Sequence, residues 1–234
     1  MKAKRLGIIG GLGTETSCQF CLNINNMVKE RTKKQPDITL ENLPVSRFAE
    51  EQLITGNVSE EYLVLLSNAV KRLNNNSNKV DLITIPCNTA HIFIDQLREI
   101  SNIPILNIIE ECAKECNSRC IKKIGLLATT KTIKEKLFEK ELEKFNIELI
   151  TPNLLEQNVL SKIILRIINN KVEKSDKVFM IKLIKDMKEQ GVEEVILGCT
   201  DLPILIKKED SPIPIINSVN ILENSAIKFL AQTN

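Results

Sequence analysis

The chain contains one internal repeat. Three pairs of short segments recur in the same order and at nearly the same separation: Arg5–Ile9 with Lys123–Leu127, the segment around Cys87 with the segment around Cys199, and Ile103–Asn107 with Ile213–Asn217. The repeating units of solenoid proteins are much shorter than half of this chain. The duplication therefore predicts two copies of one α/β unit, each of which contributes one cysteine.

The composition is that of an ordinary globular protein. The chain has 234 residues, of which 43% are hydrophobic, and this is enough to build two small cores. The 32 basic and 30 acidic residues leave a formal net charge of +2. Because the basic residues form short pairs such as Lys33-Lys34 rather than a continuous track, we expect no nucleic-acid partner.

The sequence also suggests a compartment. The apolar run after Met1–Arg5 is too short for a signal peptide, because Gly10, Gly11 and Gly13 interrupt it. No apolar stretch approaches the length of a membrane span, so no membrane association is expected. Seven cysteines, an odd number, are then better explained as reduced thiols than as a disulfide framework. We expect a cytoplasmic protein.

Apolar runs of strand length alternate with longer helical patterns, which is typical of parallel βα units. The first copy is predicted to hold strands at 5–9, 37–40, 80–85 and 104–106 and helices at about 15–33, 59–74, 89–100 and 108–117. The second is predicted to hold strands at 122–128, 147–150, 193–197 and 213–216 and helices at about 131–145, 156–171, 175–190, 201–207 and 218–231. The expected fold class is α/β, with two pseudo-symmetric domains that each consist of a parallel sheet flanked by helices.

Cys87 and Cys199 occupy equivalent places in the two copies. Each ends a strand-like run and is followed by residues that favour helix starts: Asn88 and Thr89 in one copy, Thr200 and Asp201 in the other. In a parallel sheet, ligands bind beyond the carboxyl ends of the strands. A helix N-terminus at that place lowers the pKa of a thiol and binds a carboxylate. The sequence therefore predicts two activated thiols around an anion site.

Two thiols on opposite sides of one carbon atom can invert it. A thiolate removes a proton from one face while a thiol delivers a proton to the other, and the same arrangement works in reverse. Helix termini that bind a carboxylate would stabilise the charge that develops as the α-proton leaves. A pairing of Cys87 with His91, as in a cysteine hydrolase, remains an alternative, but it leaves Cys199 without a role.

Several motifs resemble one family of known enzymes. Gly7–Gly13, Ile85–His91 and Leu197–Pro203, supported by Gly125–Thr129 and Ile213–Ile215, resemble the aspartate/glutamate racemase family of cofactor-independent amino-acid racemases. The resemblance covers nearly the whole chain. It implies a PLP-independent racemase that acts on a small amino-acid substrate, commonly as a homodimer, with the site between two domains. It also implies that the last helix packs back on the first domain, which gives domains of 1–105 with 217–234 and of 106–216.

The resemblance further implies roles for individual residues. Cys87 and Cys199 correspond to the acid/base pair, with His91 as a possible auxiliary group. By motif position the substrate-binding residues are Gly11, Leu12, Gly13, Arg47, Asn88, Thr89, Thr129, Thr130, Thr200 and Asp201.

The chain also departs from the family pattern. Typical members have proline after the opening glycines and glutamate after the second Cys-Thr, where this chain has Thr14 and Asp201. Aspartate-specific members hold the side-chain carboxylate with an arginine, which Arg47 matches, and with a lysine. Asn169 stands at the place of that lysine, with Lys171 nearby. The identity of the substrate side chain therefore stays open.

Other functions remain as alternatives: a maleate-type isomerase, a decarboxylase, or a non-catalytic amino-acid-binding protein of the same fold. The opening glycines lack the third glycine of a dinucleotide-binding fingerprint. The remaining cysteines invite a metal hypothesis, but spacings of three and four residues within helical patterns simply place side chains on one face. These residues are Cys18, Cys21, Cys112, Cys116 and Cys120, and we expect no metal there.

Overall fold

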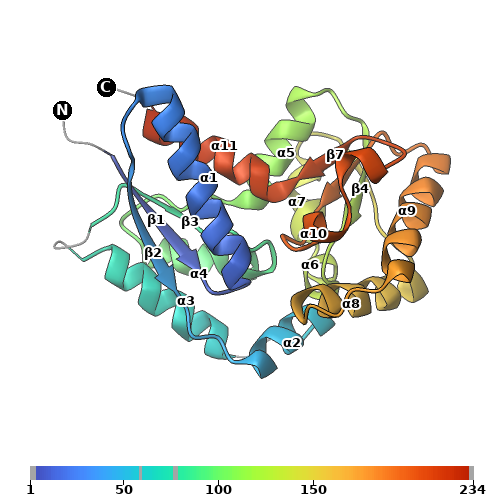
Figure 1. Cartoon of the computed structure of the whole chain (residues 1–234), viewed down its shortest axis with the longest axis horizontal. Helices are drawn as coiled ribbons and strands as arrows, with labels where there is room; N and C mark the ends of the chain where they lie inside the picture. Colours follow the sequence, from blue (N-terminus) through green and yellow to red (C-terminus); the bar gives the residue numbers. More distant parts are fainter. Residues whose placement is uncertain (1–3, 58–59, 76–78, 232–234) are drawn as a thin grey trace.

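The computed structural model describes residues 4–57, 60–75 and 79–231, which form two parallel sheets (Figure 1). The first sheet has the order β2-β1-β3, with β1 at Arg5–Gly10, β2 at Asp37–Asn42 and β3 at Leu82–Thr84. The second has the order β5-β4-β6-β7, with β4 at Lys123–Leu127, β5 at Glu148–Ile150, β6 at Glu194–Leu197 and β7 at Ile215–Asn217.

The two sheets repeat one plan. Ile105 makes a parallel bridge to Ile83 in β3, just as β7 pairs with β6 in the second sheet. Equivalent glycines in the central strands allow a helix to pack closely, since a Cβ at Gly7 would lie 2.9 Å from Leu73 and a Cβ at Gly125 would lie 2.9 Å from Met187. The predicted fold class, two α/β units built on parallel sheets, is confirmed.

Helices flank both sheets. In the first half they are α1 (Thr14–Thr32), α2 (Arg47–Thr55), α3 (Glu60–Leu73), the 3₁₀ helix η1 (Thr89–Phe93), α4 (Ile94–Glu99) and α5 (Ile108–Ser118). In the second half they are α6 (Thr130–Lys134), α7 (Leu137–Glu143), α8 (Leu154–Ile168), α9 (Lys174–Glu189), α10 (Leu202–Leu205), the 3₁₀ helix η2 (Lys208–Asp210) and α11 (Ser218–Ala231). None of the helices in the described ranges is long and apolar enough to span a membrane.

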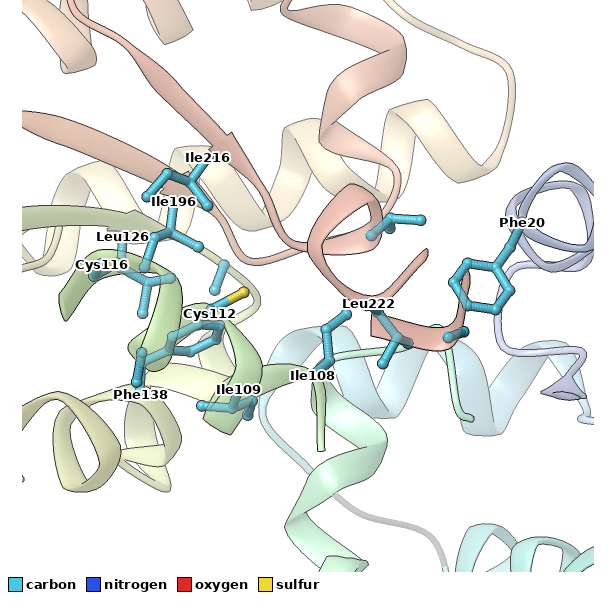
Figure 2. Close-up of a cluster of buried hydrophobic side chains, with 14 of the residues drawn as sticks. Phe20, Ile108, Ile109, Cys112, Cys116, Leu126, Phe138, Ile196, Ile216 and Leu222 are labelled. Atoms are coloured by element: carbon cyan, nitrogen blue, oxygen red, sulfur yellow. The ribbon is translucent and has the colours of Figure 1, made fainter. Parts of the chain in front are cut away.

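One hydrophobic core is shared by the two halves (Figure 2). It gathers Phe20 of α1, Cys112 of α5, Phe138 of α7 and Leu222 of α11, all of which are fully buried. Although α11 follows the last strand of the second sheet, it packs on α1 and α5 (Figure 1). The two sheets are therefore held together by helices rather than by a flexible linker. The expected division of the chain into 1–105 with 217–234 and 106–216 stays a prediction.

Two predicted elements differ from the structure, and one helix was missed. The helix predicted at 131–145 is split, because Lys136 adopts a left-handed φ of 55° between α6 and α7. The strand predicted at 104–106 is reduced to the bridge at Ile105. A whole helix, α2, was not predicted, although Ser46 caps it by accepting a hydrogen bond from the backbone N–H of Ala49 and Gly56 ends it.

Candidate active site

Both predicted cysteines line one cavity between the halves. Cys87 follows β3 and Cys199 follows β6, so each lies beyond the carboxyl end of a strand of its sheet. The cavity has a free volume of about 30 Å³. Its lining residues are Leu12, Glu50, Leu53, Ile54, Tyr62, Cys87, Asn88, Thr89, Thr129, Ile168, Cys199, Thr200 and Asp201.

The sulfur of Cys87 faces the start of η1. The backbone N–H groups of Ala90 and Thr89 bond to it and favour the thiolate, but burial disfavours the charged form more strongly. The balance raises the pKa of Cys87 from 9.0 to about 12. Our prediction that the helix terminus lowers the pKa of this thiol is therefore wrong in sign, because a single short 3₁₀ helix cannot offset the loss of water around the sulfur.

Cys199 has the same setting with one addition. The backbone N–H groups of Asp201 and Leu202 bond to the sulfur, yet burial and then the charge of Asp201 raise the pKa of the thiol well above its usual value. The thiol donates to Oδ2 of Asp201 at 3.9 Å. The two residues are 7% and 9% exposed, so this interaction is shielded from bulk water. Here, too, the predicted lowering of the pKa is wrong.

Asp201 links the second cysteine motif to the first half of the chain. Thr16 in α1 donates from Oγ1 to Oδ1 of Asp201 at 2.9 Å. The loop that brings α1 to this position turns at Gly11, whose φ is 90° and whose added Cβ would lie 2.4 Å from the carbonyl oxygen of Leu43. Burial raises the pKa of Asp201, while the hydrogen bonds from Thr16 and Cys199 lower it.

Three threonine hydroxyls join the halves beside the cavity. Oγ1 of Thr89 lies 2.9 Å from Oγ1 of Thr129 and 3.0 Å from Oγ1 of Thr132, and the last two are 3.0 Å apart. All three side chains are buried. Thr129 also caps α6 by accepting from the backbone N–H of Thr132 at 3.2 Å. The triangle fixes the start of η1 against the start of α6.

The side chain of Asn88 is held in one orientation. Ser218 donates from Oγ to the carbonyl oxygen of Leu197 at 2.8 Å, so its Oγ is an acceptor for Nδ2 of Asn88 at 2.9 Å. The remaining Oδ1 of Asn88 is buried and has no hydrogen-bond partner among the described residues. Because Asn88 lines the cavity, this oxygen is suited to accept a hydrogen bond from a ligand.

His91 bonds to the backbone rather than to a thiol. The backbone N–H of Ile108 donates to Nε2 at 3.3 Å, so the proton sits on Nδ1, which donates to the carbonyl oxygen of Cys87 at 2.9 Å. Burial lowers the pKa of the imidazole, which keeps it neutral. The loop that carries Cys87 is thus anchored to the start of α5 by the imidazole ring.

The predicted substrate residues fall into two groups. Those that line the cavity are Leu12, Asn88, Thr89, Thr129, Thr200 and Asp201; those outside the lining are Gly11, Gly13, Arg47 and Thr130. Arg47 lines a neighbouring hollow, with 72% of its side chain exposed, and donates from Nη2 to Oδ1 of Asn169 at 2.6 Å. Thr130 instead bonds to Ser161 at 2.7 Å.

Five lining residues were not predicted: Glu50, Leu53 and Ile54 of α2, Tyr62 of α3 and Ile168 at the end of α8. For the α2 residues a local signal exists in the capping serine, the apolar spacing and the closing glycine of that helix. The other cysteines take no part in the cavity. Within the described ranges, no three His, Cys, Asp or Glu side chains gather as metal ligands would.

Two α/β halves that place equivalent cysteines in one cavity define a class of duplicated α/β proteins. Comparison with known families shows which one: the model for the Asp/Glu/hydantoin racemase family matches residues 9–226. The chain belongs to this family, as the sequence motifs implied.

Individual relatives match the chain over nearly its whole length. The broad specificity amino-acid racemase RacX of Bacillus subtilis (strain 168) is 26% identical over 227 residues, which are 95% of this chain and 96% of that protein. The crystal structure of an aspartate racemase homologue from Pyrococcus horikoshii OT3 is 26% identical with a TM-score of 0.78, covering 98% of this chain and 100% of that one. The aspartate racemase of Picrophilus torridus shares the fold, with a TM-score of 0.80 at 24% identity over 98% of this chain and 95% of its own.

Proposed function

We propose that the chain is a PLP-independent amino-acid racemase in which Cys87 and Cys199 act as opposed acid and base. One observation carries the proposal: two equivalent loops, one from each half, bring their thiols to a single cavity. Membership of the racemase family supports this class of reaction. A pair of equivalent acid/base groups suits a reaction in which substrate and product are mirror images.

The proposed step conserves atoms and charge. The thiolate of one cysteine takes the α-proton and becomes a thiol, and the bonding electrons stay on the α-carbon. The thiol of the other cysteine gives its proton to the opposite face of that carbon and becomes the thiolate. The pair thus carries one negative charge before and after the reaction, and the reverse reaction exchanges the two roles of Cys87 and Cys199.

The groups around the thiols can stabilise the carbanion. The hydroxyl of Thr200 offers a donor for the α-carboxylate, and Thr89 or Thr129 can offer a second when it gives up one bond of the threonine triangle. The backbone N–H groups at the starts of η1 and α10 bond to the sulfurs and stabilise whichever of them is the thiolate. The free Oδ1 of Asn88 can accept from the α-ammonium group. These contacts would hold the α-carbon between the sulfurs.

Single cysteine variants test the mechanism. Inversion is expected to vanish in both Cys87→Ser and Cys199→Ser, measured by circular dichroism of L- and D-amino acids. In deuterated water, each variant should still exchange the α-proton of one enantiomer only, and the two variants should act on opposite enantiomers. Cys18→Ser, an exposed thiol, is the control. Inversion by either site variant would overturn the two-base mechanism.

One observation favours a second candidate, a non-catalytic amino-acid-binding protein. The raised pKa values of both thiols leave little thiolate in the free protein near neutral pH. Calorimetric binding of an amino acid without any α-proton exchange would support this function and exclude the racemase. A bound substrate that activates one thiol would instead give exchange together with binding.

The homodimer and the cytoplasmic location implied at the sequence level stay proposals. Light scattering on the purified protein over a range of concentrations tests the dimer directly. Fractionation of cells that express the chain tests the location.

A further inference from the structure

Glu50 is an unpaired carboxylate at the candidate active site. It lies in the first turn of α2 and lines the cavity of the two cysteines. Its side chain is half-buried, and within the described part of the chain it forms no hydrogen bond and no ion pair. The other carboxylate of the cavity, Asp201, already accepts from Thr16 and Cys199. Glu50 is therefore the carboxylate that is available to a ligand.

The residues that line the cavity include no cation that could pair with an acidic side chain of a substrate. Among the described residues that line it there is no lysine, arginine or histidine, whereas Glu50 and Asp201 are both acids. Arg47, the expected partner of a substrate carboxylate, is already engaged by Glu51 at 3.1 Å and by Asn169 at 2.6 Å. An aspartate or glutamate substrate would bring a second carboxylate close to these acids without a partner for it.

A second hollow adjoins the cavity at Glu50. It has a volume of about 250 Å³, lies between α2 and the end of α8, and shares Glu50, Ile54 and Ile168 with the cavity. Two of these shared residues are apolar and the third is the carboxylate of Glu50. The hollow is also lined by Arg47, whose charge is paired with Glu51, so the one cation among its described lining residues faces two carboxylates. A flexible hydrocarbon chain that ends in a cation matches this arrangement, because its carbon atoms can contact the apolar residues and its cation can reach the carboxylate.

Given the proposed racemase function, we propose that the preferred substrates are α-amino acids with a cationic side chain, such as lysine, ornithine or arginine. The side chain leaves the cavity between Ile54 and Ile168, and its cation pairs with the carboxylate of Glu50. This assigns Glu50 as a specificity-determining residue. Hydrogen bonds between charged partners in such half-buried places change affinity by about 10- to 100-fold.

A matched pair of substrates separates the effect of the side-chain charge from that of the hydrocarbon chain. Lysine and norleucine share the same carbon chain, but only lysine carries the terminal ammonium group. Wild-type kcat/KM for α-proton exchange should be about 10- to 100-fold higher for lysine than for norleucine, and lowest for aspartate and glutamate. In Glu50→Gln the lysine value should fall to the norleucine value, which itself stays within about twofold. The control is Glu60→Gln, an exposed carboxylate in the first turn of α3.

Three results would overturn the inference: a wild-type preference for aspartate or glutamate, no effect of Glu50→Gln, or an equal loss for lysine and norleucine. The last would mean that Glu50 holds the α-ammonium group that all substrates share. Binding of lysine and norleucine to Cys87→Ser, measured by calorimetry, gives an answer that does not depend on turnover. If lysine binds to Cys87→Ser more tightly than norleucine does, but the wild-type protein exchanges no α-proton, the racemase proposal fails and the assignment of Glu50 stands.

Discussion

The thiol of Cys199 donates to Oδ2 of Asp201, with 3.9 Å between sulfur and oxygen. The negative charge of Asp201 raises the pKa of Cys199, so its removal should lower that pKa. A lower pKa raises the fraction of thiolate more than it reduces the nucleophilicity of each thiolate, so alkylation becomes faster. We therefore expect faster labelling of Cys199 by iodoacetamide in Asp201→Asn.

Labelling can be followed for each cysteine by mass spectrometry of its peptide, with exposed Cys18 as the internal reference. Asp95→Asn, which removes an exposed carboxylate of α4, should leave the rate at Cys199 unchanged. Slower labelling in Asp201→Asn would mean that the loss of the hydrogen bond from Cys199 matters more than the loss of the charge.

The raised pKa of Cys87 makes a prediction about pH. A thiol with a pKa of about 12 is almost entirely protonated in neutral solution. Its labelling rate in the free protein should rise by about tenfold per pH unit between about pH 7 and pH 10, without a plateau. Stopped reactions at several pH values measure this slope. A plateau below about pH 9 would show that the N–H groups of Thr89 and Ala90 outweigh burial.

The sequence predicted those site residues that belong to short motifs at the ends of strands. Cys87 and Cys199 are marked by the strand that precedes them and the helix start that follows, and the repeat makes them equivalent. Six other predicted residues also line the cavity. They could be predicted because a motif at a strand end can be recognised without knowing how distant segments pack. The parallel sheets followed from the same alternation of short and long apolar patterns.

The rest depended on tertiary contacts. Glu50 and Ile168 come to the cavity on α2 and α8, and nothing in either segment reveals that these helices meet. The sign of the thiol pKa shift follows from burial by both halves, which outweighs the local effect of the helix start. Arg47 matched a family position by spacing, but its guanidinium turns outward to Glu51 and Asn169.

The threonine triangle should contribute to stability. Thr132→Val keeps the shape of a fully buried side chain but removes its hydroxyl, which leaves Thr89 and Thr129 bonded to each other. We expect the free energy of unfolding to fall by about 1–2 kcal/mol, measured by urea denaturation. Thr55→Val, at an exposed position of α2, should change it by less than about 0.5 kcal/mol. An equal effect of both variants would show that the triangle adds nothing.

His91 should give the folded protein a specific pH dependence. Burial lowers the pKa of its imidazole below 6.5, so at mildly acidic pH the unfolded chain binds a proton that the folded chain does not. The contribution of His91 to the free energy of unfolding should therefore fall as the pH drops below about 6.5, by at most about 1.4 kcal/mol per unit, and should be level above that. His91 is the single histidine of the chain, so no other imidazole contributes to this slope.

His91→Gln provides the comparison for that slope. The variant should be less stable at every pH because the bonds to the backbone of Cys87 and Ile108 are weakened. It should also lose the part of the pH dependence between about pH 5.5 and pH 7.5 in which the free energy of unfolding falls on acidification. The raised pKa of the buried Asp201 gives a slope of the opposite sign, which both proteins share. Urea titrations of both proteins across this range measure the difference. If the variant keeps the wild-type slope, the imidazole is not held neutral by burial, and another group is responsible for the pH dependence.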